Sequence, residues 1–342
     1  MEKIRLGKSE LMVSRIGFGG IPIQRVSEDE AVAVVNKCLE LGINYLDTAN
    51  AYSTSEERIG KAIAGKRDQV ILATKSQGRT ADEVKPHLEL SLKRFAVDYI
   101  DVYQLHNVAD MDTLEKVLGP DGPLSMLEDA KKAGIIKHIS ITSHQIDAAK
   151  AAVKSGRFET IMFPFNFIAF EPALELLELT REHDVGFIAM KPLAGGMLNN
   201  VNLAFKYLLQ FPDVLPIPGI EKVQEIEEIV ALAKKSKPIT KAERQEMEQM
   251  RKELGTRFCR RCDYCQPCTA EIPISMVMGF PSLFRHLPEQ ELFSGRFAGL
   301  MEKATDCTEC GECEERCPYD LPIREMMAEY VSIYQAEKKK GQ

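Results

Sequence analysis

The sequence predicts an α/β protein with two domains: a (β/α)8 TIM barrel over residues 1–238 and a small, mainly helical domain over residues 239–342. In the first region, apolar segments of strand length alternate with amphipathic segments of helix length. Eight strands and about eight helices within about 240 residues favour a closed barrel over an open doubly wound sheet. No G-x-G-x-x-G motif follows a strand, which removes the main support for the open sheet. Eight of the nine cysteines lie in the second region, so it differs in composition from the first.

The predicted strands of the barrel are apolar along their whole length. This pattern is expected of parallel strands that are buried on both faces. The opening segment 1–14 differs from them, and we expect it to form a hairpin that closes the floor of the barrel. The predicted strands are SRIGFGG (14–20), INYLDTA (43–49), VILATK (70–75), IDVYQLH (100–106), HISITS (138–143), TIMFPFN (160–166), VGFIAM (185–190) and VLPIPGI (214–220).

Helix boundaries between the strands carry local signals. Ser27 and Glu30 form a capping box at the start of one helix, and Gly42 stands at its end. Thr80 and Glu83 form the same box before a later helix.

A charged stretch links the two predicted domains. We expect residues 241–255 to form a solvated connecting helix that stops at Gly255. The lysines at the extreme C-terminus are expected to form a frayed tail.

Composition excludes several classes of function. The chain is 44% hydrophobic and 28% charged, and its net charge of −7 argues against nucleic acid as the main partner. The longest apolar stretch, residues 161–170, is too short to span a membrane. Nothing at the N-terminus resembles a targeting segment, which predicts a reducing, cytoplasmic setting.

Two runs of four cysteines have the spacing of cluster ligands. The second run reads C-x2-C-x2-C-x3-C-P, which wraps a chain around a 4Fe–4S cluster. Three thiolates at this spacing can each reach a different iron. The first run is less regular, because its last gap is two residues and Thr269 stands where proline is usual. The runs consist of Cys259, Cys262, Cys265 and Cys268, and of Cys307, Cys310, Cys313 and Cys317.

Zinc and disulfides are the alternatives for these cysteines. Structural zinc usually takes two separated C-x2-C pairs rather than four cysteines in ten residues. A disulfide framework suits a small secreted chain. Cys38 lies apart from both runs, in a helix with apolar periodicity, and is interpreted as a packing residue.

Polar side chains follow three successive predicted strands. Asp47 and Tyr52 come after one strand, Lys75 ends the next, and His106 ends the third. Taken singly, each has a structural explanation, such as a helix cap or a loop anchor. Together, in GINYLDTANAY, ATKS and YQLH, they resemble the catalytic tetrad of the aldo-keto reductase family, and RLGKSELMVSRIGFGG resembles that family's N-terminal segment. The resemblance covers residues 1 to about 235.

The chemistry of a tetrad explains these residue types. A carbonyl that accepts hydride becomes an alkoxide and needs a proton, which Tyr52 would supply. The Lys75 cation would make that proton easier to give, and Asp47 would orient Lys75. His106 would direct the carbonyl oxygen toward Tyr52.

The resemblance also implies a nicotinamide cofactor, with less regular contacts. Thr142 and Ser143 match residues that hold the nicotinamide amide, whereas Met162 replaces the usual glutamine on the next strand. AMKPLAGG resembles the loop that covers the pyrophosphate, and IPGIEKVQEIEEI the loop at the adenosine end. The cofactor-binding candidates are Gly20, Asp47, Thr142, Ser143, Lys191, Pro192, Leu193, Gly219, Lys222 and Glu225.

Glu225 bears on the choice between NADH and NADPH. Members of the family that are selective for NADPH place an arginine there to hold the 2′-phosphate. A carboxylate would repel that phosphate and accept a hydrogen bond from a ribose hydroxyl, which favours NADH. Lys222 is nevertheless able to bind a phosphate.

The cysteine region resembles a dicluster ferredoxin-like domain. In such domains the fourth cysteine of each run serves the cluster of the other run. This resemblance implies one ligand set of Cys259, Cys262, Cys265 and Cys317, and another of Cys307, Cys310, Cys313 and Cys268; local ligation within each run stays open.

The sequence therefore indicates an iron–sulfur oxidoreductase that interconverts a small carbonyl compound and an alcohol. Nicotinamides transfer two electrons as hydride, whereas each cluster usually transfers one, and no flavin motif links them. Two alternatives stay open: an electron-transfer protein, with a redox protein as partner and the barrel as a docking module, and a sensor that binds nicotinamide without turnover.

Overall fold

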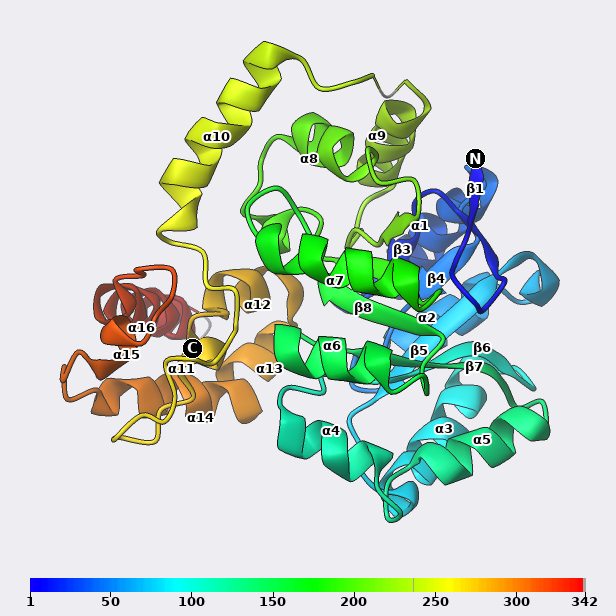
Figure 1. Cartoon of the computed structure of the whole chain (residues 1–342), viewed down its shortest axis with the longest axis horizontal. Coiled ribbons are helices and arrows are strands. Elements are labelled where there is room, and N and C mark those ends of the chain that lie inside the picture. The colour runs from blue at the N-terminus through cyan, green and yellow to red at the C-terminus, as the bar shows by residue number, and fades with distance from the viewer. Residues whose placement is uncertain (236, 341–342) are drawn as a thin grey trace. The chain divides into compact units, whose positions relative to one another are not determined.

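The computed structural model describes residues 1–235 and 237–340 (Figure 1). The chain divides into two compact units. The first contains Met1–Ala194 and Leu198–Ile239, and the second contains Gly195–Met197 and the chain from Thr240 on.

The first unit is built on a parallel sheet of eight strands in the order β3 to β10. The sheet curls until its two edge strands meet, as in a (β/α)8 barrel. The amide of Gly19 donates to the carbonyl of Pro218 at 2.8 Å, and Gly19 bridges Gly219 in parallel. The strands are β3 (Phe18–Gly19), β4 (Tyr45–Asp47), β5 (Ile71–Ser76), β6 (Ile100–Leu105), β7 (Ile136–Thr142), β8 (Thr160–Pro164), β9 (Gly186–Met190) and β10 (Val214–Pro216).

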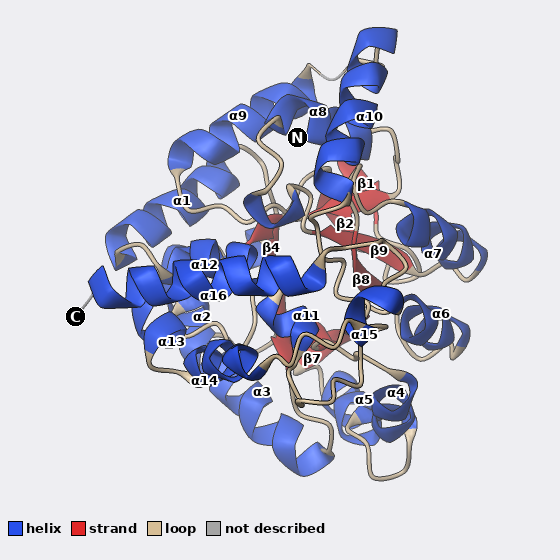
Figure 2. Ribbon diagram, turned by 90° about the vertical axis from the view of Figure 1, so that its left-hand side faces the viewer, coloured by secondary structure: helices blue, strands red, loops and turns tan. Residues whose placement is uncertain are grey.

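Helices connect these strands and surround them (Figure 2). Each predicted strand overlaps an observed one. Both predicted capping boxes are confirmed: Ser27 accepts from the amide of Glu30, and Thr80 from that of Glu83. The helices are α1 (Glu28–Glu40), α2 (Ser55–Ala62), α3 (Ala81–Phe95), α4 (Met111–Leu118), α5 (Leu124–Lys132), α6 (Ile146–Lys154), α7 (Glu171–Glu182), α8 (Val201–Leu208) and α9 (Val223–Lys234).

The barrel interior changes from apolar to polar along the strands. A buried apolar cluster fills its lower part, and polar side chains follow two residues later on neighbouring strands. Because side chains on a strand return to the same face every second residue, both sets point inward. The apolar set includes Tyr45, Ala73, Val102, Met162, Ile188 and Leu215. The polar set is Asp47, Lys75 and Gln104.

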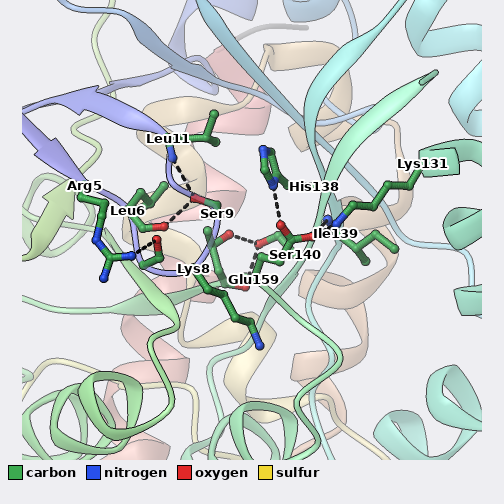
Figure 3. A network of polar contacts seen from close by, with 12 residues as sticks. Arg5, Leu6, Lys8, Ser9, Leu11, Lys131, His138, Ile139, Ser140 and Glu159 are labelled. Atoms are coloured by element: carbon green, nitrogen blue, oxygen red, sulfur yellow. Dashed lines mark hydrogen bonds and ion pairs between the residues drawn. The ribbon is translucent and has the colours of Figure 1, made fainter.

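The expected N-terminal hairpin is confirmed as an antiparallel pair, β1 (Lys3–Arg5) and β2 (Met12–Ser14). Its turn lies against the chain that enters β9, where Gly7 bridges Val185. Leu6 is fully buried in the apolar cluster of the barrel, and the Ser9 hydroxyl bonds to the Leu6 carbonyl at 2.5 Å (Figure 3). The hairpin therefore covers the end of the barrel where the strands begin.

A charged cluster lies at the same end of the sheet (Figure 3). Glu159, just before β8, bonds to both His138 of β7 and Lys131 of α5. Burial alone would raise the pKa of Glu159, but these two partners hold it below its usual value. The cluster ties a helix and two strands together at the floor.

All the regular elements in the described residues of the second unit are helices, and loops such as residues 256–273 connect them. Its core contains apolar side chains together with Cys265, Cys313 and Cys317. No helix in the described parts of the chain is both long and apolar enough to cross a membrane. The helices are α10 (Lys241–Gly255), α11 (Ile274–Val277), α12 (Phe280–His286), α13 (Glu289–Phe293), α14 (Arg296–Lys303), α15 (Glu312–Glu315) and α16 (Ile323–Lys340).

The expected frayed lysine tail is wrong. The lysines up to Lys340 belong to α16, and Lys338 pairs with Glu302 of α14 at 2.9 Å. Apolar residues spaced along α16, among them Tyr330 and Tyr334, are buried, so packing carries the helix through its basic end.

The close approach at the barrel floor makes Gly7 sensitive to substitution. Gly7 has a φ of +56°, and a Cβ there would lie 2.6 Å from the Val185 carbonyl carbon and 2.7 Å from the Asp184 oxygen. Gly65 is the matched control, because its φ is +74° and nothing lies within 4 Å of an added Cβ. We expect Gly65→Ala to cost about 1–2 kcal/mol for the backbone conformation. Gly7→Ala should cost about 1–3 kcal/mol more for the overlap. Urea denaturation measures both; equal losses would contradict this account of the floor.

Candidate active site

The four tetrad candidates lie at the ends of three neighbouring parallel strands. Asp47 is the last residue of β4, Lys75 is near the end of β5, and His106 directly follows β6. Tyr52 lies in the turn between β4 and α2, where its amide donates to the carbonyl of Ala49 at 2.9 Å. The carboxyl ends of parallel strands share one edge, so the four residues share one mouth of the barrel.

The structure brings these four side chains together. The Lys75 Nζ donates to the Asp47 Oδ2 at 2.6 Å and lies 5.2 Å from the centre of the Tyr52 ring. The centres of the Tyr52 and His106 rings are 5.8 Å apart, with the ring planes at 83°. The arrangement therefore places the Tyr52 phenol near both an ammonium and an imidazole.

The ion pair at the base of the site is shielded from water. Asp47 is 3% exposed and Lys75 is 2% exposed. Burial raises the pKa of the Asp47 carboxyl, and the Lys75 cation opposes that shift. Lys75 also donates to the carbonyl of Thr48 at 2.5 Å, so its ammonium is held from two sides.

Sequence reasoning missed Gln104. This residue lies on β6 two positions before His106, and its Nε2 donates to the Asp47 Oδ1 at 2.7 Å. The available signal was a polar side chain in an apolar strand, on the same inward face as His106.

Sequence reasoning also missed Arg79. Its guanidinium donates to the carbonyls of His106 and Asn107 at 2.7 and 2.9 Å. Asn107 has a φ of +53°, an uncommon conformation that these bonds help to hold. Arg79 thereby holds the backbone that carries the His106 ring.

The candidates for holding the nicotinamide bond to the chain itself. The Thr142 Oγ1 accepts from the amide of Asn107 at 2.7 Å, and the Ser143 hydroxyl donates to the carbonyl of Val108 at 2.7 Å. Met162, which replaces the usual glutamine, is buried in the barrel core. A contact from Thr142 or Ser143 to a nicotinamide amide therefore stays a prediction.

The pyrophosphate candidates lie around the end of β9. Lys191 has a φ of +56°, and its carbonyl accepts from the Asn166 Nδ2 at 3.0 Å. Pro192 and Leu193 follow it directly. After β3, Gly20 leaves no room for a side chain, since a Cβ there would meet the Ser55 hydroxyl at 2.9 Å.

Glu225 has a structural role besides the predicted contact to a ribose hydroxyl of the cofactor. Its Oε2 accepts from the amides of Glu221 and Lys222 at 2.9 and 3.1 Å, which caps the start of α9 after Gly219. A capping carboxylate needs no cofactor to explain its presence. The assignment of Glu225 to a ribose hydroxyl therefore stays a prediction.

Cysteines of both runs meet inside the second unit. Cys268, the last cysteine of the first run, lines a pocket together with the second run. The Thr269 hydroxyl beside it lies 4.0 Å from the Cys310 sulfur. The cysteines that line this pocket are Cys265, Cys268, Cys307, Cys310 and Cys313.

Cys317, the last cysteine of the second run, lies near the first run. Burial raises the pKa of the Cys262 thiol, and a negative charge on Cys317 adds to the shift. Burial also raises the pKa of Cys265 to about 12, with Cys259 adding to it. Arg316, next to Cys317, donates to the carbonyl of Pro267 at 2.8 Å and so ties the two runs together.

The described residues contain no group of three or more histidine, cysteine, aspartate or glutamate side chains that could hold a metal ion. The two 4Fe–4S clusters therefore stay a prediction. Thiol groups are nevertheless the soft ligands that iron–sulfur clusters require.

Comparison with known proteins agrees with the barrel geometry. Residues 15–203 match the model of the aldo/keto reductase family. The uncharacterized oxidoreductase YqkF of Bacillus subtilis is 33% identical over 212 residues, which cover 58% of this chain and 67% of the relative. L-galactose dehydrogenase of Arabidopsis thaliana is 32% identical over 213 residues, covering 56% and 66%. The chain thus spans about two thirds of the length of these relatives.

A solved structure also resembles the barrel of this chain. The aldo-keto reductase AKR11C1 from Bacillus halodurans superposes with a TM-score of 0.62 at 29% identity. The match covers 73% of this chain and 96% of that protein.

The buried ion pair predicts a pH-dependent loss of stability in Lys75→Met. Removing the cation leaves the Asp47 carboxylate buried and uncompensated, which should cost about 3–5 kcal/mol near neutral pH. Burial raises the pKa of Asp47 above its unfolded value, so the folded protein takes up the proton first as pH falls. The deficit of Lys75→Met against the wild type should therefore shrink on acidification.

Urea denaturation of both proteins at about pH 8 and about pH 5 measures this change. The control adds Asp47→Asn to Lys75→Met, which removes the buried charge and should recover most of the loss. An equal deficit at both pH values would contradict the account.

Proposed function

The chain belongs to the aldo/keto reductase family, and from this premise we propose that its barrel interconverts a small carbonyl compound and an alcohol. The observation that carries the proposal is the convergence of Tyr52, Lys75 and His106 over a buried Asp47. Tyr52 is the proton donor in the direction of reduction.

The chain's residues handle the proton and the carbonyl oxygen. A bound dihydronicotinamide supplies a hydride, the electron pair that forms the new C–H bond. The carbonyl oxygen takes the negative charge, and Tyr52 transfers its hydroxyl proton to it, leaving a phenolate and the product alcohol. His106 donates to the same oxygen and aligns it with the Tyr52 hydroxyl.

Lys75 lowers the free energy of the Tyr52 phenolate relative to the neutral phenol. A cation 5.2 Å from the ring centre favours the negatively charged form of Tyr52 over the neutral one. In the direction of oxidation the same phenolate takes the proton of the alcohol. Asp47 compensates the Lys75 charge inside the barrel, so that the ammonium is stable there.

We propose a nicotinamide dinucleotide as the hydride source. NADH is favoured by the carboxylate of Glu225, although the cap of α9 also uses that carboxylate. A relative from Schizosaccharomyces pombe, 27% identical, carries NADP(+) in its name. Both cofactors therefore belong in any assay. Because one relative is named L-galactose dehydrogenase, aldoses are the first substrates to try.

We further propose that the second unit holds two 4Fe–4S clusters with crossed ligation. The spacing of the runs motivates the proposal. Crossing is supported because Cys268 lines a pocket with three cysteines of the second run, and Cys317 interacts with Cys262 of the first. Such clusters supply one-electron transfer. They would serve a redox protein partner or stabilise the unit.

Tyr52→Phe tests the proton donor, because it removes the hydroxyl and keeps the ring. We expect turnover to fall by ~10² or more, the usual contribution of a positioned acid. Binding of NADH and NADPH, followed by fluorescence, should change little. A panel of aldoses and other carbonyl compounds, assayed without oxygen, supplies the substrate. If Tyr52→Phe works at the wild-type rate, the tetrad is not the catalyst, and an electron-transfer role becomes the better interpretation.

Iron and sulfide analysis tests the clusters. Protein purified and reconstituted without oxygen should hold about eight iron and eight sulfide per chain. Cys317→Ser should damage the cluster held mainly by the first run, and Cys268→Ser the other, as followed by EPR. Cys38→Ser is the matched control and should leave both clusters unchanged. Stoichiometric zinc without sulfide would overturn the assignment.

A further inference from the structure

Gln104 is a fully buried polar side chain on the inward face of β6. It lies between Val102, which belongs to the apolar layer of the barrel, and His106 at the mouth. None of the four tetrad roles uses it, so its presence in an otherwise apolar strand needs a physical reason.

The contact that Gln104 makes completes the bonding of Asp47. The Gln104 Nε2 donates to Oδ1 at 2.7 Å, while the Lys75 Nζ donates to Oδ2 at 2.6 Å. Lys75 and Gln104 are register partners on adjacent strands, β5 and β6. Each carboxylate oxygen is therefore held from a different strand, which prevents the carboxylate from turning about its last bond.

The other end of the Gln104 amide shows that packing alone does not explain this residue. Its Oε1 is buried and has no hydrogen-bond partner among residues 1–235 and 237–340. An unsatisfied buried acceptor costs free energy that an apolar side chain of the same size would avoid. The hydrogen bond to Asp47 is the compensating interaction that the structure shows.

We propose that Gln104 is a positioning residue of the proton-transfer site, which holds the Asp47 carboxylate in place and keeps it ionised so that Lys75 stays beside Tyr52. The proposal rests on the carbonyl chemistry proposed above, but the contact to Asp47 can be tested without a substrate. Gln104 itself touches neither the reacting oxygen nor the proton.

The electrostatic effect of Gln104 has a definite sign. Burial raises the pKa of Asp47, and both Lys75 and the amide of Gln104 oppose that shift. Removing the amide donor takes away one opposing interaction, so Asp47 should take up its proton at a higher pH. A neutral Asp47 no longer compensates the Lys75 ammonium, and the site then loses the geometry that favours the Tyr52 phenolate.

Gln104→Met is the main variant, because methionine has a similar length and no donor. We expect kcat to fall about tenfold, with KM and the Kd for the nicotinamide cofactor within about twofold of wild type. The acidic limb of the kcat profile should also move to higher pH, because Asp47 takes up its proton earlier as the pH falls.

Gln104→Glu is the second variant, and it should add a loss of activity on the basic side of the profile. A protonated glutamic acid can still donate to Asp47, but ionisation on raising the pH would place two carboxylates together. Its activity should therefore fall as pH rises. Val102→Ala is the matched control on the same strand and face: it should lower the melting temperature and leave the pH profile unchanged.

Titration of the Asp47 carboxyl supplies a readout that needs no turnover. In protein carrying 13C-labelled aspartate, the Asp47 signal is identified by its loss in Asp47→Asn. We expect it to titrate at higher pH in Gln104→Met than in wild type. The proposal is overturned if the two titrations coincide, or if the pH profile of Gln104→Met follows that of Val102→Ala. If wild-type protein reduces no carbonyl compound, the proposed function fails, while the titration still decides the role of Gln104.

Discussion

The buried ion pair between Asp47 and Lys75 is the constraint on which the rest of the barrel depends. Two opposite charges that are at most 3% exposed are tolerable only while they stay paired and hydrogen-bonded. Adjacent strands must therefore keep their register, because a slip of one residue would turn both side chains out of the barrel. The bond from Gln104 adds a third strand to the same requirement. The register of β4, β5 and β6 and the positions of the side chains at the barrel mouth therefore depend on the same charge pair.

The rest of the barrel keeps this pair dry and in place. Below it, the apolar layer and the N-terminal hairpin, with Leu6 inserted, exclude water from the floor. Above it, Arg79 holds the backbone through the carbonyls of His106 and Asn107. A phenol beside a compensated ammonium then becomes a better proton donor without any strongly exposed charge. Stability and the proposed chemistry therefore depend on the same few hydrogen bonds.

In the second unit, the physical question is how the core accommodates buried thiols. Its core includes thiols that are buried among apolar side chains, and burial raises the pKa of Cys265 and Cys313. Buried neutral thiols pack as small apolar groups, whereas thiolates need a metal centre to balance their charge. Arg316 links the two runs through the backbone carbonyl of Pro267. The proposed clusters would balance the charge of the thiolates in this core.

The sequence by itself determined the features that depend on neighbouring residues. Continuous apolar runs of strand length, capping boxes such as Ser27 with Glu30, and the spacing of Asp47 and Tyr52 are local patterns, and the strands and caps were predicted correctly for that reason. Only the tertiary structure decided which distant groups meet. Gln104 reaches a carboxylate two strands away because the sheet curls. The C-terminal lysines stay helical because α16 is packed. Such contacts depend on closure and packing, which no local pattern encodes.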